Sequence, residues 1–148
     1  MSLTPDRLAR VEIMPAEGRA YILARDGADQ PWRLASPALA TLAQSTLTAT
    51  AERITQLTPI DVRTAPAIQG TPRARVRALT FDGIVIDAEL IPSDNRTWVK
   101  LVARAGAPEQ EPAALEINNR SAAWAYALSD IEAESVAPPL SRLIPGAQ

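Results

Sequence analysis

The chain has 148 residues, of which 47% are hydrophobic and 22% charged, and this balance is typical of one globular domain. It contains no cysteine and no histidine, which excludes zinc sites built on these residues, cysteine nucleophiles and serine–histidine–aspartate triads. The formal net charge of −2 gives no electrostatic reason to expect nucleic-acid binding. We therefore expect no metal, no cofactor and no catalytic residues.

The first third of the chain predicts three antiparallel strands. Residues 10–14 alternate polar and apolar side chains, Glu17-Gly18 is typical of a turn, and residues 20–25 resume a β-favouring run. A second turn signal precedes residues 31–34, which alternate again around Trp32 and predict a third strand that pairs with the second.

A helix is expected next, at about residues 45–57. Four apolar side chains recur there at helical spacing and share one face, namely Leu47, Ala51, Ile54 and Leu57. Ser36-Pro37 is an alternative helix start, because serine is favoured at an N-cap and proline at the first helical position. The proline-rich residues 58–72 then indicate a connector.

The same unit recurs after the connector. Strands are predicted at residues 75–81, 84–91 and 97–102, with Asp82-Gly83 as the turn between the first two. Trp98 follows Gly83 by 15 positions, as Trp32 follows Gly18 by 14. We interpret the two halves as diverged copies of a β-β-β-α element, in which each tryptophan fills the strand–helix core of its own unit.

The C-terminal part predicts a helix, a strand and a last helix. Pro112 suits the first turn of a helix that runs to about Arg120. Residues 124–128 place large apolar groups at every second position, which favours a strand, although the alternating alanines leave a continuing helix open. Ser129-Asp130 begins the last helix and Pro138-Pro139 interrupts it. Its inward-facing side chains are expected to be Ile131, Val136, Leu140, Leu143 and Ile144.

These elements predict an α+β fold in which two related β-β-β-α units, at about residues 8–58 and 73–145, pack antiparallel sheets against helices. The two halves are joined by the proline-rich connector and are expected to form a single compact domain. No apolar stretch reaches the roughly 18–20 residues that span a bilayer, and the first residues lack the pattern of a signal peptide.

Acidic side chains near the second hairpin are the remaining candidates for acid–base chemistry. They are Asp82, Asp87, Glu89 and Asp94. A glycosidase-type pair needs two carboxyl groups about 5–10 Å apart across a cleft. Asp82 precedes a turn glycine, where aspartate accepts hydrogen bonds from nearby amides, and Asp87 and Glu89 share one strand face toward water. We therefore expect structural roles for all four carboxylates.

Four side chains are candidates for binding. They are Asn118, Arg120, Trp124 and Tyr126. Trp124 and Tyr126 either pack in the core or face a partner, since amphipathic aromatic residues are enriched at interfaces. Arg120 suits a carboxylate of a ligand, or it lies at a helix C-terminus, where a basic residue complements the helix dipole.

Five segments of the second half share their order and spacing with a known family. They are Phe81-Asp82-Gly83, Thr97-Trp98-Val99-Lys100-Leu101, Glu116-Ile117-Asn118-Asn119-Arg120, Trp124-Ala125-Tyr126-Ala127-Leu128 and Leu140-Ser141-Arg142-Leu143-Ile144. The first half follows the pattern more loosely, through Val11-Glu12-Ile13 and Trp32-Arg33-Leu34. On these segments, most of the chain resembles the bacterial domain of unknown function family 4340.

The resemblance implies an accessory role beside a transporter. Members of that family are encoded near ABC transporters of the gliding-motility type, usually with an N-terminal membrane anchor and the domain outside the cytoplasm. We therefore expect a non-catalytic, extracytoplasmic interaction domain whose partner is a protein of a transporter or envelope assembly. The anchor is missing here, so either it was trimmed or this placement does not apply, and the absence of cysteine leaves the cytoplasm open. The alternative is a small-ligand or glycan-binding module that uses Trp124, Tyr126 and Asn118.

Overall fold

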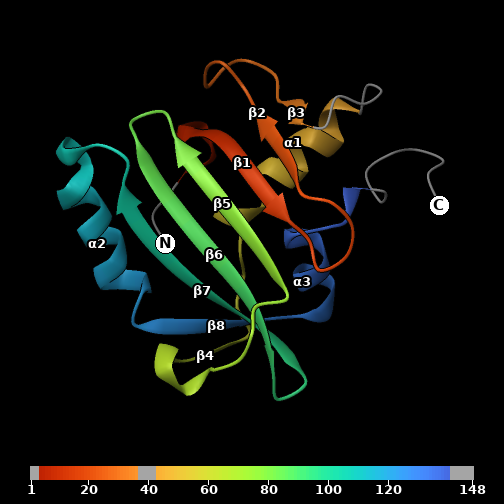
Figure 1. Cartoon of the computed structure of the whole chain (residues 1–148), viewed down its shortest axis with the longest axis vertical. Coiled ribbons are helices and arrows are strands. Elements are labelled where there is room, and N and C mark those ends of the chain that lie inside the picture. The colour runs from red at the N-terminus through yellow and green to blue at the C-terminus, as the bar shows by residue number, and fades with distance from the viewer. Residues whose placement is uncertain (1–3, 37–42, 141–148) are drawn as a thin grey trace.

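The computed structural model describes residues 4–36 and 43–140, which contain eight strands and three α-helices (Figure 1). The strands are β1 (Leu8–Met14), β2 (Tyr21–Ala24), β3 (Arg33–Ser36), β4 (Asp61–Thr64), β5 (Ala74–Thr80), β6 (Ile84–Ser93), β7 (Arg96–Ala105) and β8 (Trp124–Leu128). The helices are α1 (Gln44–Glu52), α2 (Glu111–Ser121) and α3 (Asp130–Val136). All described strands join one antiparallel sheet in the order β3-β2-β1-β5-β6-β7-β8-β4. The predicted α+β class is confirmed.

The order β-β-β-α occurs twice in the described chain, as β1-β2-β3-α1 and as β5-β6-β7-α2. Both units share a single sheet, because β1 pairs with β5 and places Val11 opposite Ala78 and Ile13 opposite Val76. The strand order is therefore symmetrical about this junction, with β2 and β3 on one side and β6 and β7 on the other.

The hairpin turns form where the sequence predicts them. Gly18 and Gly83 have φ angles of +89° and +95°, a region that glycine enters without steric cost. Asp94 and Asn95 join β6 to β7 and also have positive φ, as a two-residue type I′ turn requires. Local side-chain chemistry thus sets the register of β5, β6 and β7.

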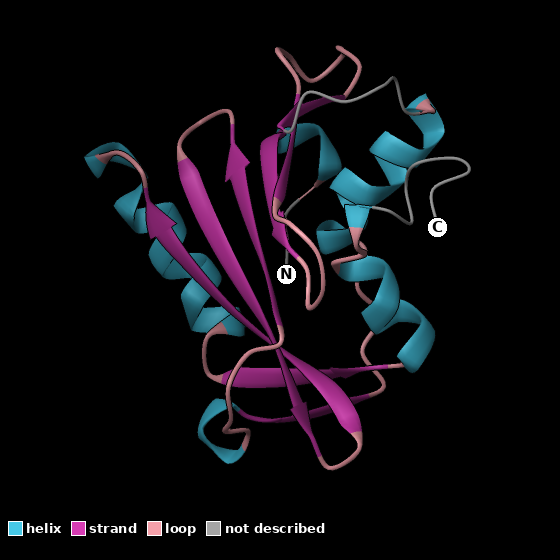
Figure 2. Ribbon diagram, turned by 45° about the vertical axis from the view of Figure 1, so that its right-hand side comes forward, coloured by secondary structure: helices cyan, strands magenta, loops and turns pink. Residues whose placement is uncertain are grey.

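The sheet has one buried face and one open face. Side chains from the inner face of the strands pack with side chains from all three helices in the main core cluster, among them Val11, Val76, Ile86, Leu101, Ala51, Ile117 and Val136. The alternate side chains of β1, β5, β6 and β7 point to the opposite face. Figure 2 shows β4 and β8 at the lower end of the sheet, turned across the long strands.

The two tryptophans of the repeat have different surroundings. Trp32 lies in the main cluster with Leu47 of α1, as predicted. Trp98 is fully buried in a second cluster, whose other members are Ile68, Ile91, Ala125 and Ala127. No residue of the three described helices belongs to that cluster, so the prediction of a strand–helix core around Trp98 is wrong. The reason is the period of two in β7, which directs Trp98 away from the helix-bearing face.

Residues 58–72 contribute to the sheet as well as connecting the halves. β4 belongs to this segment and forms the terminal strand beside β8. Ile68 is completely buried and packs in the cluster of Trp98. The segment therefore covers part of the sheet face that the helices leave open.

The predicted helices are largely confirmed. α1 and the following 3-10 turn, Arg53–Thr55, occupy most of the range predicted for the first helix, which ends two residues earlier than expected. Ser36 belongs to β3, and Pro37 lies outside the described residues. The ambiguous segment 124–128 is the strand β8. The Ser129 hydroxyl caps α3 by accepting a hydrogen bond from the Glu132 amide at 3.2 Å.

One inward-facing position of the last helix was predicted wrongly. Ile131 is 84% exposed, because it lies in the first turn of the short helix α3 on the side away from the sheet. Val136 and Leu140 are buried in the main core cluster, as predicted. Leu143 and Ile144 lie outside the described residues.

A buried arginine joins the N-terminal segment to the first hairpin. Arg25 is 8% exposed, and its guanidinium donates hydrogen bonds to the backbone carbonyls of Pro5, Leu8 and Ala28 at 2.7, 2.9 and 3.1 Å. The guanidinium also lies 4.6 Å from the centre of the Trp32 ring, a distance at which a cation–π interaction is favourable. Carbonyl oxygens and an aromatic face thus replace the water that the cation loses.

Replacing Arg25 is expected to destabilise the fold. Arg25→Met leaves three carbonyls without their donor and should lower the free energy of unfolding by about 2–4 kcal/mol. Arg25→Lys keeps the charge but lacks the planar fork, so an intermediate loss is expected. Urea denaturation followed by circular dichroism measures both losses. The matched control is Arg33→Met, which removes only an exposed ion pair with Asp26 and should change stability by about 1 kcal/mol or less.

Candidate functional site

Asn118, one of the four predicted binding residues, has a structural role. Its carboxamide accepts a hydrogen bond from the Ala103 amide and donates one to the Ala103 carbonyl, both at 2.7 Å. β8 pairs with β7 only from Thr97 to Lys100. The side chain of Asn118 therefore substitutes for a neighbouring strand where the edge of β7 would otherwise be open.

Arg120 and Tyr126 also make intramolecular contacts. The Arg120 guanidinium lies 3.3 Å from the Glu116 carboxylate one helical turn away, with both side chains more than half exposed. The Tyr126 hydroxyl donates to the Arg120 carbonyl at 3.5 Å. The four predicted residues are thus neighbours around α2 and β8, but the polar ones are engaged within the chain.

Trp124 is the exposed member of this group. Its side chain is 42% exposed, and its neighbours on the edge strand are exposed as well, with Val62 at 46% and Ile60 at 57%. Val62 lies opposite Tyr126 and Thr64 opposite Trp124, so these side chains share one sheet face. We call the surface formed by Ile60, Val62, Trp124 and Tyr126 the β4–β8 patch.

A small cavity adjoins the β4–β8 patch. It has a volume of about 80 Å³ and is lined by Ile54, Thr55, Leu57, Pro59, Leu101 and Tyr126. Tyr126 therefore links the exposed patch to the partly buried side chains beneath the turn that follows α1. The patch continues the apolar character of the helix-bearing face beyond the region that the helices cover.

The outer edge of β4 is partly protected against strand addition. The Val62 amide donates to the carboxylate of Asp61 at 2.8 Å, and the same carboxylate is 3.1 Å from the Arg96 guanidinium. A short edge strand with charged residues is a common protection against pairing with another chain. An added strand at this edge would displace the hydrogen bond of the Val62 amide.

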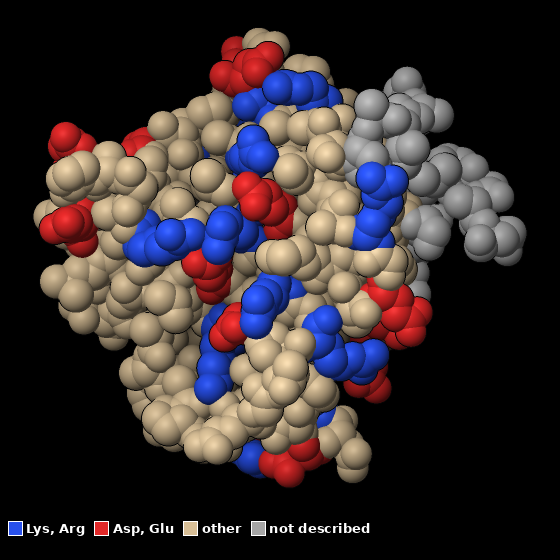
Figure 3. Space-filling view, in the orientation of Figure 1, with Lys and Arg blue, Asp and Glu red and all other residues tan. Residues whose placement is uncertain are grey.

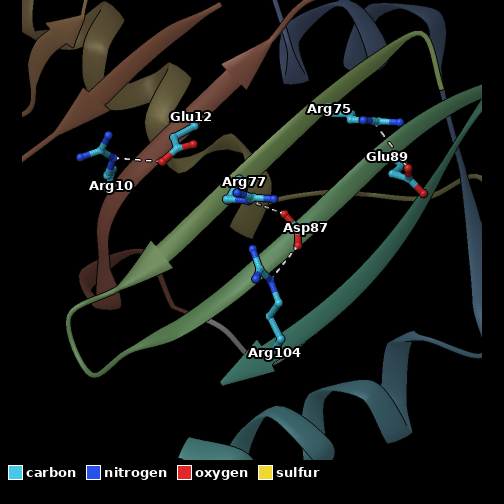
Figure 4. A network of polar contacts seen from close by, with 7 residues as sticks. All are labelled: Arg10, Glu12, Arg75, Arg77, Asp87, Glu89 and Arg104. Atoms are coloured by element: carbon cyan, nitrogen blue, oxygen red, sulfur yellow. Dashed lines mark hydrogen bonds and ion pairs between the residues drawn. The ribbon is translucent and has the colours of Figure 1, made fainter. Parts of the chain in front are cut away.

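The open face carries a ladder of charged side chains (Figure 4). Arg77 is 2.7 Å and Arg104 is 3.3 Å from the carboxylate of Asp87, which lies between them on β6. Arg75 is 3.6 Å from Glu89, its cross-strand partner, and Arg10 pairs with Glu12 along β1 at 3.1 Å. Figure 3 shows the positive and negative side chains interspersed over this face.

The sequence pattern predicts part of this ladder. Arg75 and Arg77 alternate along one strand, as Asp87 and Glu89 do along the next. The shared face of Asp87 and Glu89 was predicted and is confirmed. The cations opposite them could be assigned only once the register between the strands was known.

The candidate carboxylates for catalysis are held in ion pairs and turns. Asp82 lies in the β5–β6 turn, 2.9 Å from Arg7, and its side chain is 45% exposed. A hydrogen bond from the Thr80 hydroxyl, followed by the nearby Arg7, holds the pKa of Asp82 below its usual value. A general acid needs a raised pKa, so this environment does not suit acid catalysis by Asp82. Asp94 is exposed and pairs with Arg63 at 2.8 Å.

A groove lies on the helix-bearing face of the sheet, opposite the charged ladder. It has a volume of about 480 Å³ and lies between α3, the β1–β2 loop and the start of β5, with Glu17, Arg73, Leu90 and Asp130 among its lining residues. None of Asn118, Trp124 and Tyr126 lines it. The residues predicted for the ligand-binding alternative therefore do not line this groove.

Comparisons with known proteins give no assignment: no family model, no curated protein and no solved structure matches the chain. The resemblance to the domain of unknown function family 4340 therefore stays a prediction. Within residues 4–36 and 43–140, no three acidic side chains come together as metal ligands would. None of the helices in the same ranges has the length and hydrophobicity of a membrane span.

Asn118→Asp tests the edge-closing role. Aspartate has the same shape and still accepts from the Ala103 amide, but it cannot donate to the Ala103 carbonyl. We expect the free energy of unfolding to fall by about 1–3 kcal/mol, the cost of leaving a partly buried carbonyl without its donor. Chemical denaturation measures the loss. Asn119→Asp is the control on the same helix, and an equal loss in both variants would contradict the role.

Asp82→Asn tests the turn carboxylate by pH. The pKa of Asp82 is lowered in the folded state, so its stabilisation is present above the unfolded pKa near about 4 and is lost as the pH falls through the lower folded value. The variant should be less stable than the parent near neutral pH, by about 1 kcal/mol or less because the side chain is exposed. The difference should vanish in acid, as urea midpoints at several pH values would show. A difference independent of pH would contradict the assignment.

Proposed function

We propose that this chain is a non-catalytic interaction domain that binds a protein partner through the β4–β8 patch. The observation that carries the proposal is the exposure of Trp124 beside Val62 and Ile60 on one surface. Tryptophan and tyrosine in apolar surroundings are the residues that most often dominate the energy of protein interfaces. Large apolar side chains that remain exposed together in a folded domain are typical of interaction sites.

The surroundings of Trp124 favour a protein partner over a sugar. A glycan platform combines an aromatic ring with side chains that hydrogen-bond to hydroxyl groups. Here the Asn118 amide is used by the Ala103 backbone, and the neighbours on the patch are Val62 and Ile60. The hydroxyl groups of a sugar would find no hydrogen-bond partners on this patch. An apolar protein side chain needs none.

The partner is proposed to be a protein of an ABC transporter or envelope assembly, with the domain outside the cytoplasm. This part of the proposal is supported by the resemblance given above and by the residue types that are missing from the chain, since cysteine and histidine account for many catalytic sites. An accessory role fits a domain whose carboxylates on the described strands serve ion pairs.

Site-specific crosslinking tests the proposed surface. Benzoylphenylalanine in place of Thr64, on the same face as Trp124, is expected to capture a partner protein in the native host. The same group in place of Ile131, exposed on α3, is the matched control and should not capture it. With the purified partner, Trp124→Ala should weaken binding about 30-fold, corresponding to the loss of about 2 kcal/mol at an interface hot spot.

Three results would contradict the proposal. The first is equal capture at positions 64 and 131, and the second is unchanged affinity of Trp124→Ala, provided that circular dichroism shows both proteins folded. The third is that deletion of the domain changes neither transporter assembly nor substrate flux. A sugar or lipid fragment that raises the melting temperature of the parent but not of Trp124→Ala would favour the ligand-binding alternative.

A further inference from the structure

The charged ladder on the open face is not neutral. Its cations are Arg10, Arg75, Arg77, Lys100 and Arg104, and its carboxylates are Glu12, Asp87 and Glu89. The whole chain has a formal net charge of −2, so the positive excess of this face is opposite in sign to the rest of the molecule. Such a separation of charge favours association with an acidic surface.

The excess lies on β7. Asp87 is shared by Arg77 and Arg104, with the shorter distance to Arg77, 2.7 Å against 3.3 Å. Lys100 is adjacent to Glu89 in register, yet it forms no ion pair with any described residue. The carboxylates of the ladder therefore neutralise Arg104 and Lys100 less than the other cations.

An exposed apolar side chain lies between these two cations. Val102 is 49% exposed and shares the open face with Lys100 and Arg104, because residues two apart in a strand point the same way. The two cations are four residues apart, which corresponds to about 13 Å along the strand. We call Lys100, Val102 and Arg104 the β7 row.

We infer that the β7 row binds an acidic segment of another protein, with carboxylates on Lys100 and Arg104 and an apolar side chain on Val102. The inference is independent of the β4–β8 patch, since the row lies on the opposite face of the sheet. Asn118 closes the adjacent edge of β7 at Ala103, so the segment binds through side chains and not as an added strand.

The chemistry of the face favours an acidic protein over a nucleic acid or an anionic membrane. Three carboxylates interrupt the cations, and a closely spaced row of phosphates would approach them. Nucleic-acid binding depends on clustered cations without such interruptions. A protein segment can place its carboxylates opposite the two unbalanced cations and leave the remainder of the ladder undisturbed.

The test uses a synthetic peptide with glutamates on both sides of a central leucine and the isotope-labelled domain. Titration at low ionic strength is expected to shift the backbone amide signals of residues 100–104, and the shifts should diminish near physiological salt because exposed charges are screened. The double variant Lys100→Glu with Arg104→Glu should weaken binding at least about tenfold, which corresponds to about 1.4 kcal/mol. Arg120→Glu, an exposed arginine on α2 with one ion pair, is the control and should bind like the parent.

A second pair of variants separates the apolar contact from the charges. Val102→Ser should weaken binding of the leucine peptide but not of a peptide with serine at the centre. The peptide with glutamine in place of glutamate should not bind at all. These comparisons keep the test valid even if one charge reversal disturbs the fold, which circular dichroism would reveal.

Several outcomes would overturn the inference. They are the absence of shifts at residues 100–104, equal binding by the charge-reversed double variant, and tighter binding of a DNA duplex or of phosphatidylglycerol vesicles than of the acidic peptide. None of these results bears on the β4–β8 patch, because Trp124→Ala leaves the β7 row intact and should bind the peptide normally.

Discussion

The pairing of β1 with β5 is the interaction on which the arrangement of the molecule depends. It joins two β-β-β-α units into one sheet and aligns Val11 with Ala78 and Ile13 with Val76. Because the inner faces of both units become continuous, a single core cluster is shared by all three described helices. The opposite face is left without a helix layer, and its alternate side chains must be compatible with water. Charged residues in ion pairs meet that requirement.

Two exposed strand segments, on β4 and at the end of β7, have backbone groups that side chains occupy. An exposed strand edge invites pairing with other chains, and the described structure meets this hazard with short polar side chains. Asn118 occupies the amide and carbonyl of Ala103, and Asp61 accepts from the Val62 amide. The polar side chain of Asn118 predicted a binding role, whereas in the structure it occupies the backbone of β7. The two surfaces proposed for binding accordingly use side chains on the faces of the sheet.

The sequence predicted those features that depend on local chemistry. Turn residues such as Gly83 and the N-cap Ser129 act within a few positions of themselves, so the α+β class and the order of the strands and helices other than β4 followed from them. The surroundings of Trp98 did not, because they depend on Ile68 returning from the connector to cover it. The meeting of Arg77 and Arg104 at Asp87 was not predicted either, because the sequence indicates where the turns lie but not which residues of the paired strands are opposite each other. The environment of Trp124 depends on β4, which pairs with β8. The sequence did not predict β4, because it lies in the proline-rich segment that was interpreted as a connector.

The two proposed surfaces would contribute to binding in different ways. Apolar contacts such as those of Trp124 and Val62 gain free energy from the removal of water and mainly slow dissociation, whereas exposed charges such as Lys100 mainly speed encounter. Since the β4–β8 patch lies on the helix-bearing face and the β7 row on the open face, one flat partner cannot cover both. A partner that wraps around β7 and β8, or two separate partners, would engage them together. Salt should then weaken attachment at the β7 row while leaving the β4–β8 patch largely unaffected, which makes ionic strength the variable that separates the two contributions.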